Sequence, residues 1–343
     1  MDVVNILRDL VKFNTIKDKE NKKILDYIEN YLLKLGFNTK YKNKYLIMEY
    51  GKNIKFGFIG HSDTVEYIDG WNSDPFILTK KDNNLYGLGA CDMKGGIAAF
   101  LSAISDIDLK KLKYGIRVYI TYDEEIGFTG IKEIVEKKEI FPEYVLVGEP
   151  TENKEMIGCK GLFAIKLYTK GIKVHSSTPD KGISANTSMI RLLCELEDFY
   201  NEKIRNIKNN KYEISNTTMN IGLLNGGSAI NSVAAECMSY IDFRTISNKH
   251  VIMLKEKLDE LCKKYDGYYI VDIDVNTFYN EISNIKKAYT AGFMTEASFI
   301  NNCKKIILGP GPMTAHEINE HVDINSLLKC KEQYKNLIEK ICN

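Results

Sequence analysis

Five short segments of the chain place histidine or carboxylate side chains just after a mainly apolar run. They are residues 60–65 (GHSDTV), 89–96 (GACDMKGG), 123–125 (DEE), 147–151 (VGEPT) and 309–317 (GPGPMTAHE). Apolar runs of this kind are typical of buried strands, and the carboxyl ends of parallel strands meet at one edge of a sheet. We therefore expect the polar side chains of these segments to lie close together.

The side-chain types in these segments suit divalent metal ions. Taken singly, a histidine after a strand is usually a packing residue, and the pair Glu124 and Glu125 resembles an ordinary helix start. Two histidines with three or four carboxylates at one sheet edge are better explained as ligands of two adjacent metal ions than as separate packing and helix-start residues. Imidazole and carboxylate ligands without thiolate favour zinc or manganese in an open, catalytic site.

The pattern between these segments predicts an α/β fold. Apolar runs predict strands at residues 54–60, 116–122, 144–147 and 305–308. Helical spacing of apolar residues predicts two helices within the first 36 residues and further helices at 95–105, 127–138 and 323–342. Strands that alternate with helices imply a mainly parallel sheet with helices on both faces.

Residues 161–279 have a different order of predicted strands and helices. Strands are expected at 162–169, 217–223, 234–244 and 268–276, and helices at 183–204 and 251–265. This β-α-β-β-α-β order is that of a ferredoxin-like unit, which can fold as a small domain. We therefore expect a catalytic domain of residues 1–160 and 280–343, interrupted by an inserted domain of residues 161–279. Two remaining histidines, His250 and His321, are expected on the surface.

The composition limits the possible partners. The chain has 343 residues with 47 basic and 46 acidic side chains, so its formal net charge is +1. This balance argues against nucleic acid or an anionic membrane surface as the main partner. No apolar tract approaches the about 18 residues of a membrane helix, and charges interrupt the first apolar runs, so we expect neither a membrane span nor a signal peptide. The eight scattered cysteines are expected to be reduced in a cytoplasmic protein.

The stretch from residue 60 to residue 96 resembles the zinc-dependent deacylase family, which includes acetylornithine deacetylase, succinyl-diaminopimelate desuccinylase, aminoacylase and glutamate carboxypeptidase. Within this family, the segments most similar to acetylornithine deacetylase are residues 85–95, 147–151, 295–297 and 308–311. The resemblance covers essentially the whole chain. It implies a phosphorylase/hydrolase-like α/β catalytic domain with a mainly parallel sheet, and an inserted ferredoxin-like lid domain through which a homodimer forms.

The resemblance also implies a set of metal ligands. His61 and Glu149 would hold one ion, Glu125 and His316 would hold the other, and Asp92 would bridge both. The two ions would be zinc, with cobalt or manganese as alternatives. In this family the peptide bond after the bridging aspartate is commonly cis.

Three further residues would act in catalysis by the same resemblance. Asp63 would orient the ring of His61, and Glu124 would be the general base for a metal-bridging hydroxide that attacks the acyl carbonyl. His175, in the inserted domain, would stabilise the oxyanion. In this family that histidine usually comes from the other subunit of a dimer.

Four residues would bind the substrate. Arg244 would hold its α-carboxylate through both guanidinium nitrogens, and Asn231 would make a second contact. The backbone N–H groups of Gly309 and Gly311 would face the same carboxylate. A strand-end charge and a tight turn are the simpler explanations of Arg244 and of the two glycines.

Together, the site and the resemblance predict a two-metal amidohydrolase that removes an N-acyl group from an amino acid. The expected substrate is N2-acetyl-L-ornithine, hydrolysed to L-ornithine and acetate as in arginine biosynthesis. Desuccinylation of N-succinyl-diaminopimelate, and dipeptidase or carboxypeptidase activity, use the same metal chemistry and stay open. A non-catalytic homologue that binds metal or peptide is a more distant alternative.

Spacing disfavours three other classes of enzyme or binding protein. His316 and His321 are five positions apart, whereas an H-E-x-x-H zinc site needs four. Gly87 does not begin a G-x-G-x-x-G nucleotide-binding motif, because the residue at position 92 is aspartate. The sequence also contains no phosphate-binding G-x-x-x-x-G-K-[ST] motif and no G-x-S-x-G nucleophile elbow.

Overall fold

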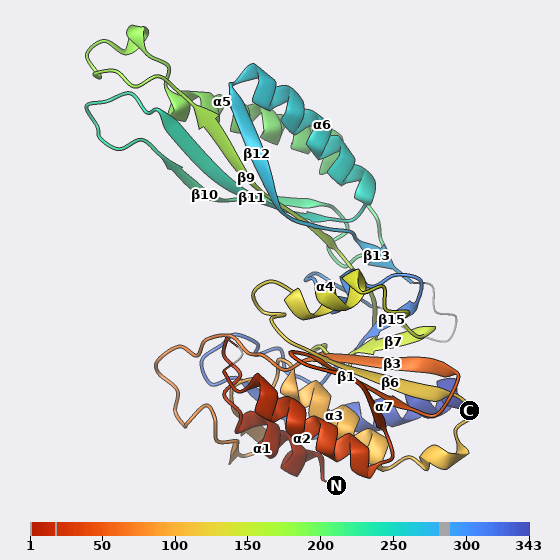
Figure 1. The fold of residues 1–343 in the computed structure, drawn as a ribbon. Helices are drawn as coiled ribbons and strands as arrows, with labels where there is room; N and C mark the ends of the chain where they lie inside the picture. Colours follow the sequence, from red (N-terminus) through yellow and green to blue (C-terminus); the bar gives the residue numbers. More distant parts are fainter. Residues whose placement is uncertain (1, 18, 281–288) are drawn as a thin grey trace. The chain divides into compact units, whose positions relative to one another are not determined.

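The computed structural model describes residues 2–17, 19–280 and 289–343. The chain divides into two compact units. The first consists of Met1–Ile157, Asn280–Tyr289 and Thr295–Asn343, and the second consists of Gly158–Tyr279 and Thr290–Met294. Figure 1 shows the helices and strands of both units along the sequence.

A mixed sheet is the framework of the first unit. Its four central strands are parallel, in the order β6 (Gly115–Thr121), β3 (Ile54–His61), β7 (Tyr144–Val147) and β15 (Lys304–Ile307). Most of their residues are buried, as near-continuous apolar runs require when both faces of a sheet are covered. The strands predicted from these runs are confirmed to within one or two residues.

The outer strands were not predicted from the sequence, and they make the sheet mixed. Next to β6 lie β2 (Leu46–Tyr50) and then β1 (Asn38–Lys42), both antiparallel to their neighbours. Next to β15 lies β8 (Met156–Cys159), again antiparallel, and β14 (Tyr289–Ala291) pairs with β8. The last two residues of β8, Gly158 and Cys159, belong to the second unit, where they pair with β13 (Phe278–Tyr279). Strands such as β1 are short, polar and largely exposed, so they lack the apolar run that identifies a central strand.

Helices cover both faces of the central strands. In Figure 1, α1 (Val3–Val11), α2 (Asn21–Lys34) and α3 (Lys94–Ser105) lie on one side of the sheet and α4 (Thr129–Glu136) lies on the other. The last helix, α7 (Ile324–Cys342), packs against α3 and β3. These helices confirm the predicted amphipathic segments. None of the helices in the described residues is both long and apolar enough to cross a membrane.

Helix α3 packs unusually close to the sheet and brings the preceding turn to the ends of the strands. Every residue from Lys94 to Ile104 is buried. A Cβ atom on Gly96 would lie 2.0 Å from the carbonyl oxygen of Gly148, so only glycine allows this approach. Further along the helix, the ring of Phe100 stacks on Phe58 of β3 with a centroid separation of 4.0 Å.

A small second sheet ties together two distant segments of the first unit. Its strands are β16 (His321–Asp323), β5 (Asn84–Tyr86) and β4 (Thr79–Lys81), paired antiparallel in that order. The segment that leads to Asp92 therefore lies beside the segment that follows His316. The sequence did not predict these strands, because three residues are too few to show a period.

The second unit is a four-stranded antiparallel sheet with two helices. Along the chain its elements are β9 (Gly161–Lys170), α5 (Ala185–Phe199), β10 (Thr218–Gly226), β11 (Glu236–Thr245), α6 (Asn248–Lys264) and β12 (Gly267–Val275). The strand order in the sheet is β10-β11-β9-β12. The predicted β-α-β-β-α-β order is therefore present, although the first helix changes to a π-helical turn at Tyr200–Ile204.

The prediction that His250 lies on the surface is wrong. Its exposed fraction is only 3%, and its Nδ1 atom lies 2.7 Å from the hydroxyl oxygen of Thr217. The position of His250 near the start of a helix suggested that it is exposed. In the structure, however, this first turn of α6 packs against the segment before β10. Burial lowers the pKa of His250, as expected for an imidazole that is kept neutral.

Candidate metal centre

The segments predicted to carry metal ligands converge at one edge of the central sheet. His61 is the last residue of β3, Glu125 follows β6 and Glu149 follows β7. Asp92 lies in the turn before α3, and His316 lies in the loop between β15 and β16. Because the central strands are parallel neighbours, their carboxyl ends lie side by side, and residues far apart in sequence meet there.

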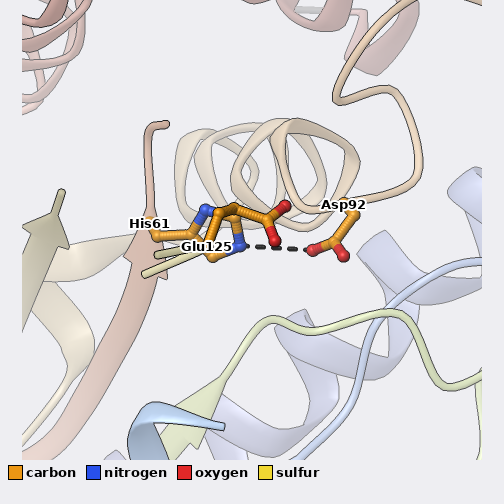
Figure 2. A group of neighbouring side chains, drawn as sticks. All are labelled: His61, Asp92 and Glu125. Atoms are coloured by element: carbon orange, nitrogen blue, oxygen red, sulfur yellow. Dashed lines mark hydrogen bonds and ion pairs between the residues drawn. The ribbon is translucent and has the colours of Figure 1, made fainter. Parts of the chain in front are cut away.

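His61 is fully buried and is held between two aspartates. Its Nδ1 atom lies 3.1 Å from the backbone oxygen of Asp63 and 3.4 Å from the carboxylate of that residue. Its Nε2 atom lies 3.2 Å from Oδ1 of Asp92, the contact drawn in Figure 2. Burial alone would lower the pKa of His61, but the two carboxylates raise it well above its usual value. With Nδ1 engaged by Asp63, Nε2 is the nitrogen that is directed at the acidic cluster.

The carboxylate of Asp92 faces two histidines, one through each oxygen. Oδ1 lies near His61, and Oδ2 lies 3.7 Å from Nε2 of His316. A different glutamate accompanies each histidine: Glu149 Oε1 is 3.9 Å from His61 Nε2, and Glu125 Oε2 is 2.8 Å from His316 Nε2. The five side chains thus form two sets, each of one histidine and one glutamate, with Asp92 shared between them. The peptide bond between Asp92 and the next residue is cis.

The acceptor atoms of this cluster fit divalent cations. Oε1 of Glu125 and Oε1 of Glu149 are buried and have no hydrogen-bond partner among the described residues. Candidate ligand atoms of His61, Asp92 and Glu125 all lie within 4.8 Å of one another, and so do those of His61, Glu124 and Glu149. Buried acceptors without donors are costly unless a cation satisfies them. Imidazole nitrogen with carboxylate oxygen is a ligand set that zinc, cobalt and manganese accept.

Glu124 lies within the same cluster but was predicted to be a base. Its carboxylate comes close enough to His61 and Glu149 to belong to one of the two candidate ligand groups. Burial raises the pKa of Glu124 well above its usual value, and the negative charges of Asp92 and Glu125 raise it further, against the opposing effect of His61. A carboxyl group in this environment holds a proton more readily than an exposed glutamate does.

Two further acids belong to the site but were not predicted as site residues. Glu296, with an exposed fraction of 1%, interacts electrostatically with His61, and burial raises its pKa to about 7. Glu320, with an exposed fraction of 2%, hydrogen-bonds to the turn that carries Asp92. The local sequence around Glu296 is that of an ordinary acidic residue at the start of a helix. Glu320 stands in a polar segment, as an exposed loop residue would. Residues 295–297 were singled out only for their resemblance to a known family, and it is the burial of Glu296 and Glu320 that identifies both as part of the cluster.

The predicted substrate-binding glycines already have hydrogen-bond partners. The backbone N–H of Gly309 donates to Oγ1 of Thr151 at 3.1 Å, and that of Gly311 donates to Oγ of Ser326 at 2.9 Å. A carboxylate could bind these N–H groups only by replacing both hydroxyls. Their role in substrate binding stays a prediction.

Three predicted residues belong to the second unit. Nδ1 of His175 lies 2.8 Å from the hydroxyl of Ser177, in a loop that also contacts Asn231, whose backbone oxygen accepts from the N–H of Ser176 at 3.0 Å. Arg244, in β11, makes an ion pair with Asp242 at 3.1 Å. Within this unit, His175 and Asn231 are neighbours. Their roles in catalysis and substrate binding stay predictions.

The chain matches a known protein family and is similar to enzymes of known sequence. The model of peptidase family M20/M25/M40 matches residues 57–340. The chain is 31% identical to an acetylornithine deacetylase from Buchnera aphidicola subsp. Schizaphis graminum, over 99% of this chain and 98% of the relative. It is 29% identical to an acetylornithine deacetylase from Photorhabdus laumondii, over 95% of this chain and 92% of the relative.

Solved structures show the same fold. A tripeptidase from Staphylococcus aureus superposes with a TM-score of 0.81 at 22% identity, covering 99% of this chain and 98% of the other. A metallo-carboxypeptidase from Sulfolobus solfataricus gives 0.80 at 18% identity and 99% coverage of both chains. A dinuclear metal-binding peptidase from Bacillus subtilis gives 0.73 at 12% identity, covering 99% and 98%. The predicted α/β fold with a separate antiparallel sheet is thereby confirmed.

We expect the metal-free protein to lose stability as the pH rises from about 4.5 to about 8. The carboxyl groups of Glu149 and Glu296 have pKa values raised by burial, so the folded state keeps protons that the unfolded chain releases near pH 4.5. The stability linked to such a group is complete below its unfolded pKa and declines as the pH passes through its folded pKa. Thermal denaturation of chelator-treated protein at pH 5, 6, 7 and 8 measures this slope.

The matched variants are Glu149→Gln and Glu136→Gln, because Glu149 is buried and Glu136 is exposed. The first substitution removes a titrating group from the cluster and should flatten the slope, whereas the second should leave it unchanged. A melting temperature that rises with pH in the wild type, or equal slopes in all three proteins, would contradict the expected linkage.

Proposed function

Because the chain belongs to peptidase family M20/M25/M40 and is a metallohydrolase of amide or peptide bonds, we propose that it removes the N-acyl group from an amino acid. The proposed substrate is N2-acetyl-L-ornithine, which would yield L-ornithine and acetate. Similarity to acetylornithine deacetylases over nearly the full length supports this choice. The observation that carries the proposal of two-metal chemistry is the Asp92 carboxylate, whose two oxygens face two separate histidine–glutamate pairs.

Five residues would hold the two divalent ions. In the proposed arrangement the ligands are His61 with Glu149, His316 with Glu125, and Asp92 shared between the pairs. When bound, such ions polarise a substrate carbonyl and lower the pKa of water towards neutrality. Asp63 holds Nδ1 of His61 and so directs Nε2 towards the proposed metal position.

Glu124 would carry the proton through the reaction. Its carboxylate accepts a proton from the water that attacks the acyl carbon, and it then delivers that proton to the leaving amine nitrogen as the amide C–N bond breaks. The position of Glu124 supports this assignment, because its carboxylate lies with His61 and Glu149 in one of the two candidate ligand groups and is therefore close to where the ions and their water would bind. One proton enters and one leaves, so the residue is regenerated in each cycle.

The second unit would supply the contacts that select the substrate. We assign residues 161–279 to a lid that also forms a homodimer, with His175 donating its N–H to the developing oxyanion. Arg244 would hold the α-carboxylate through two parallel N–H bonds, and Asn231 would add a second contact. Arg244 is paired with Asp242 in the structure, so substrate binding would have to compete with this ion pair.

A peptide is the second candidate substrate. Several solved structures with this fold are peptidases, among them a tripeptidase and a carboxypeptidase. Peptides and N-acyl amino acids present the same amide bond and the same carboxylate, so the metal chemistry does not distinguish them. N-succinyl-diaminopimelate undergoes the same amide hydrolysis, but it carries one additional carboxylate in its acyl group and another in its amino-acid part, so contacts in the substrate pocket would have to discriminate it from N2-acetyl-L-ornithine.

A parallel assay tests the proposed substrate. We expect the zinc- or cobalt-loaded enzyme to hydrolyse N2-acetyl-L-ornithine with a higher kcat/KM than N-succinyl-diaminopimelate or any member of a panel of di- and tripeptides. Release of the free amine measures all reactions on the same scale. A higher kcat/KM for a peptide would transfer the assignment to the second candidate, and no hydrolysis of any substrate would reject both.

Replacing the proposed base separates proton transfer from metal binding. We expect Glu124→Gln to keep two equivalents of bound metal and to lower kcat by at least about 100-fold, because the amide cannot accept the proton. Glu125→Gln, one residue away, should instead lose one equivalent of metal. Metal content by elemental analysis and turnover on the best substrate give both readouts. A Glu124→Gln variant with nearly normal kcat would remove the general-base assignment.

A further inference from the structure

Glu320 is a buried carboxylate that the proposed mechanism does not use. It lies four residues after His316 and directly precedes β16. Only 2% of its surface is exposed, whereas the neighbouring Glu317 is exposed. A glutamate is rarely buried without a partner that offsets the loss of hydration.

Both carboxylate oxygens of Glu320 accept hydrogen bonds from the turn before α3. Oε2 accepts from the backbone N–H of Gly89 at 2.8 Å. Oε1 accepts from the N–H of Cys91 at 2.8 Å and from the N–H of Asp92 at 2.9 Å. These are short bonds to carboxylate oxygens, and such bonds are about twice as strong as bonds between neutral groups when the carboxylate is ionised.

The backbone around Glu320 strengthens the same connection. Its carbonyl oxygen accepts from the N–H of Gly87 at 3.1 Å, and the next residue, His321, pairs with Tyr86 across the small sheet. The chain on both sides of Gly89 is thus fixed to one segment. Gly89 itself has a φ of +77°, a conformation that favours glycine.

This arrangement has a direct consequence for Asp92. The carboxylate of Asp92 can face both His61 and His316 only if its backbone is held at one position and one orientation. The N–H of Asp92 is bound by Glu320, and His316 lies on the same loop as Glu320. One carboxylate therefore sets the position of the shared aspartate relative to the loop that carries one of the two histidines.

We propose that Glu320 is a positioning residue that holds Asp92 between the two metal sites. The proposal rests on the proposed function, in which Asp92 bridges two ions. Glu320 acts through backbone N–H groups and touches neither ion nor substrate. By fixing the backbone of Asp92, Glu320 keeps the bridging carboxylate oriented towards both histidine–glutamate pairs. Little reorganisation of Asp92 is then needed when metal binds.

The chemistry of the contacts identifies the informative substitution. Three N–H donors converge on two carboxylate oxygens. In Glu320→Gln one oxygen becomes an NH₂ group, which cannot accept, so at least one N–H of the turn faces another donor. The side-chain volume stays the same. Glu317→Gln is the matched control, because it changes the same residue type three positions away on the exposed part of the same loop.

Metal titration provides a readout that is independent of turnover. We expect Glu320→Gln to bind Zn²⁺ or Co²⁺ about 10- to 100-fold more weakly than the wild type, as is typical when a group that supports a ligand is lost. The visible absorption of the Co²⁺-loaded protein should change, and kcat should fall more than KM rises. Glu317→Gln should match the wild type in all three measurements. Wild-type affinity and an unchanged Co²⁺ spectrum in Glu320→Gln would overturn the proposal.

Two further measurements separate positioning from folding and from the proposed function. Without metal, Glu320→Gln should retain a cooperative melting transition above the assay temperature, while amide exchange at residues 89, 91 and 92 becomes at least tenfold faster. If Glu320→Gln does not fold, Glu320→Asp, which keeps the charge but is one methylene shorter, is measured against the same expectations. Unchanged exchange at these amides rejects the hydrogen-bonding role. A wild type that binds no metal rejects the proposed function instead, whatever the exchange rates show.

Discussion

Several carboxyl groups share one buried corner of the first unit, and their mutual repulsion has to be balanced. Burial raises the pKa values of Glu124, Glu125 and Glu149, so these groups resist ionisation. Burial opposes ionisation of Asp92 as well, but its contact with His61 lowers its pKa. Such a cluster is costly for a fold unless cations neutralise it. The strands and helices around these acids place them where divalent ions would neutralise them.

The fold meets this constraint by holding each acid on a rigid element. Parallel strands end at the same edge, which places His61 and Glu149 side by side although they are far apart in the sequence. The close approach of Gly96 to Gly148 brings the start of α3, and with it Asp92, against the end of β7. Strand ends fix one part of the cluster, and a tightly packed helix fixes another.

The sequence predicted the parts of this arrangement that follow from repeated patterns. Apolar runs identified the central strands, and the polar residues at their ends indicated where ligands such as His61 would lie. Other features depend on contacts between distant segments and leave no local pattern. Glu320 sits among exposed polar residues, and His250 stands at a helix start, yet both are buried by segments far away in sequence. The small sheet also leaves no pattern in the sequence, because its strands β4, β5 and β16 have only three residues each.

In the proposed site a single aspartate, Asp92, lies between two metal ions. Anomalous diffraction at the zinc absorption edge, on crystals grown with zinc, locates bound ions without reference to activity. Two peaks are expected, one among His61, Asp92 and Glu149 and the other among His316, Asp92 and Glu125. A single peak, or two peaks that do not both lie next to the Asp92 carboxylate, would contradict this arrangement.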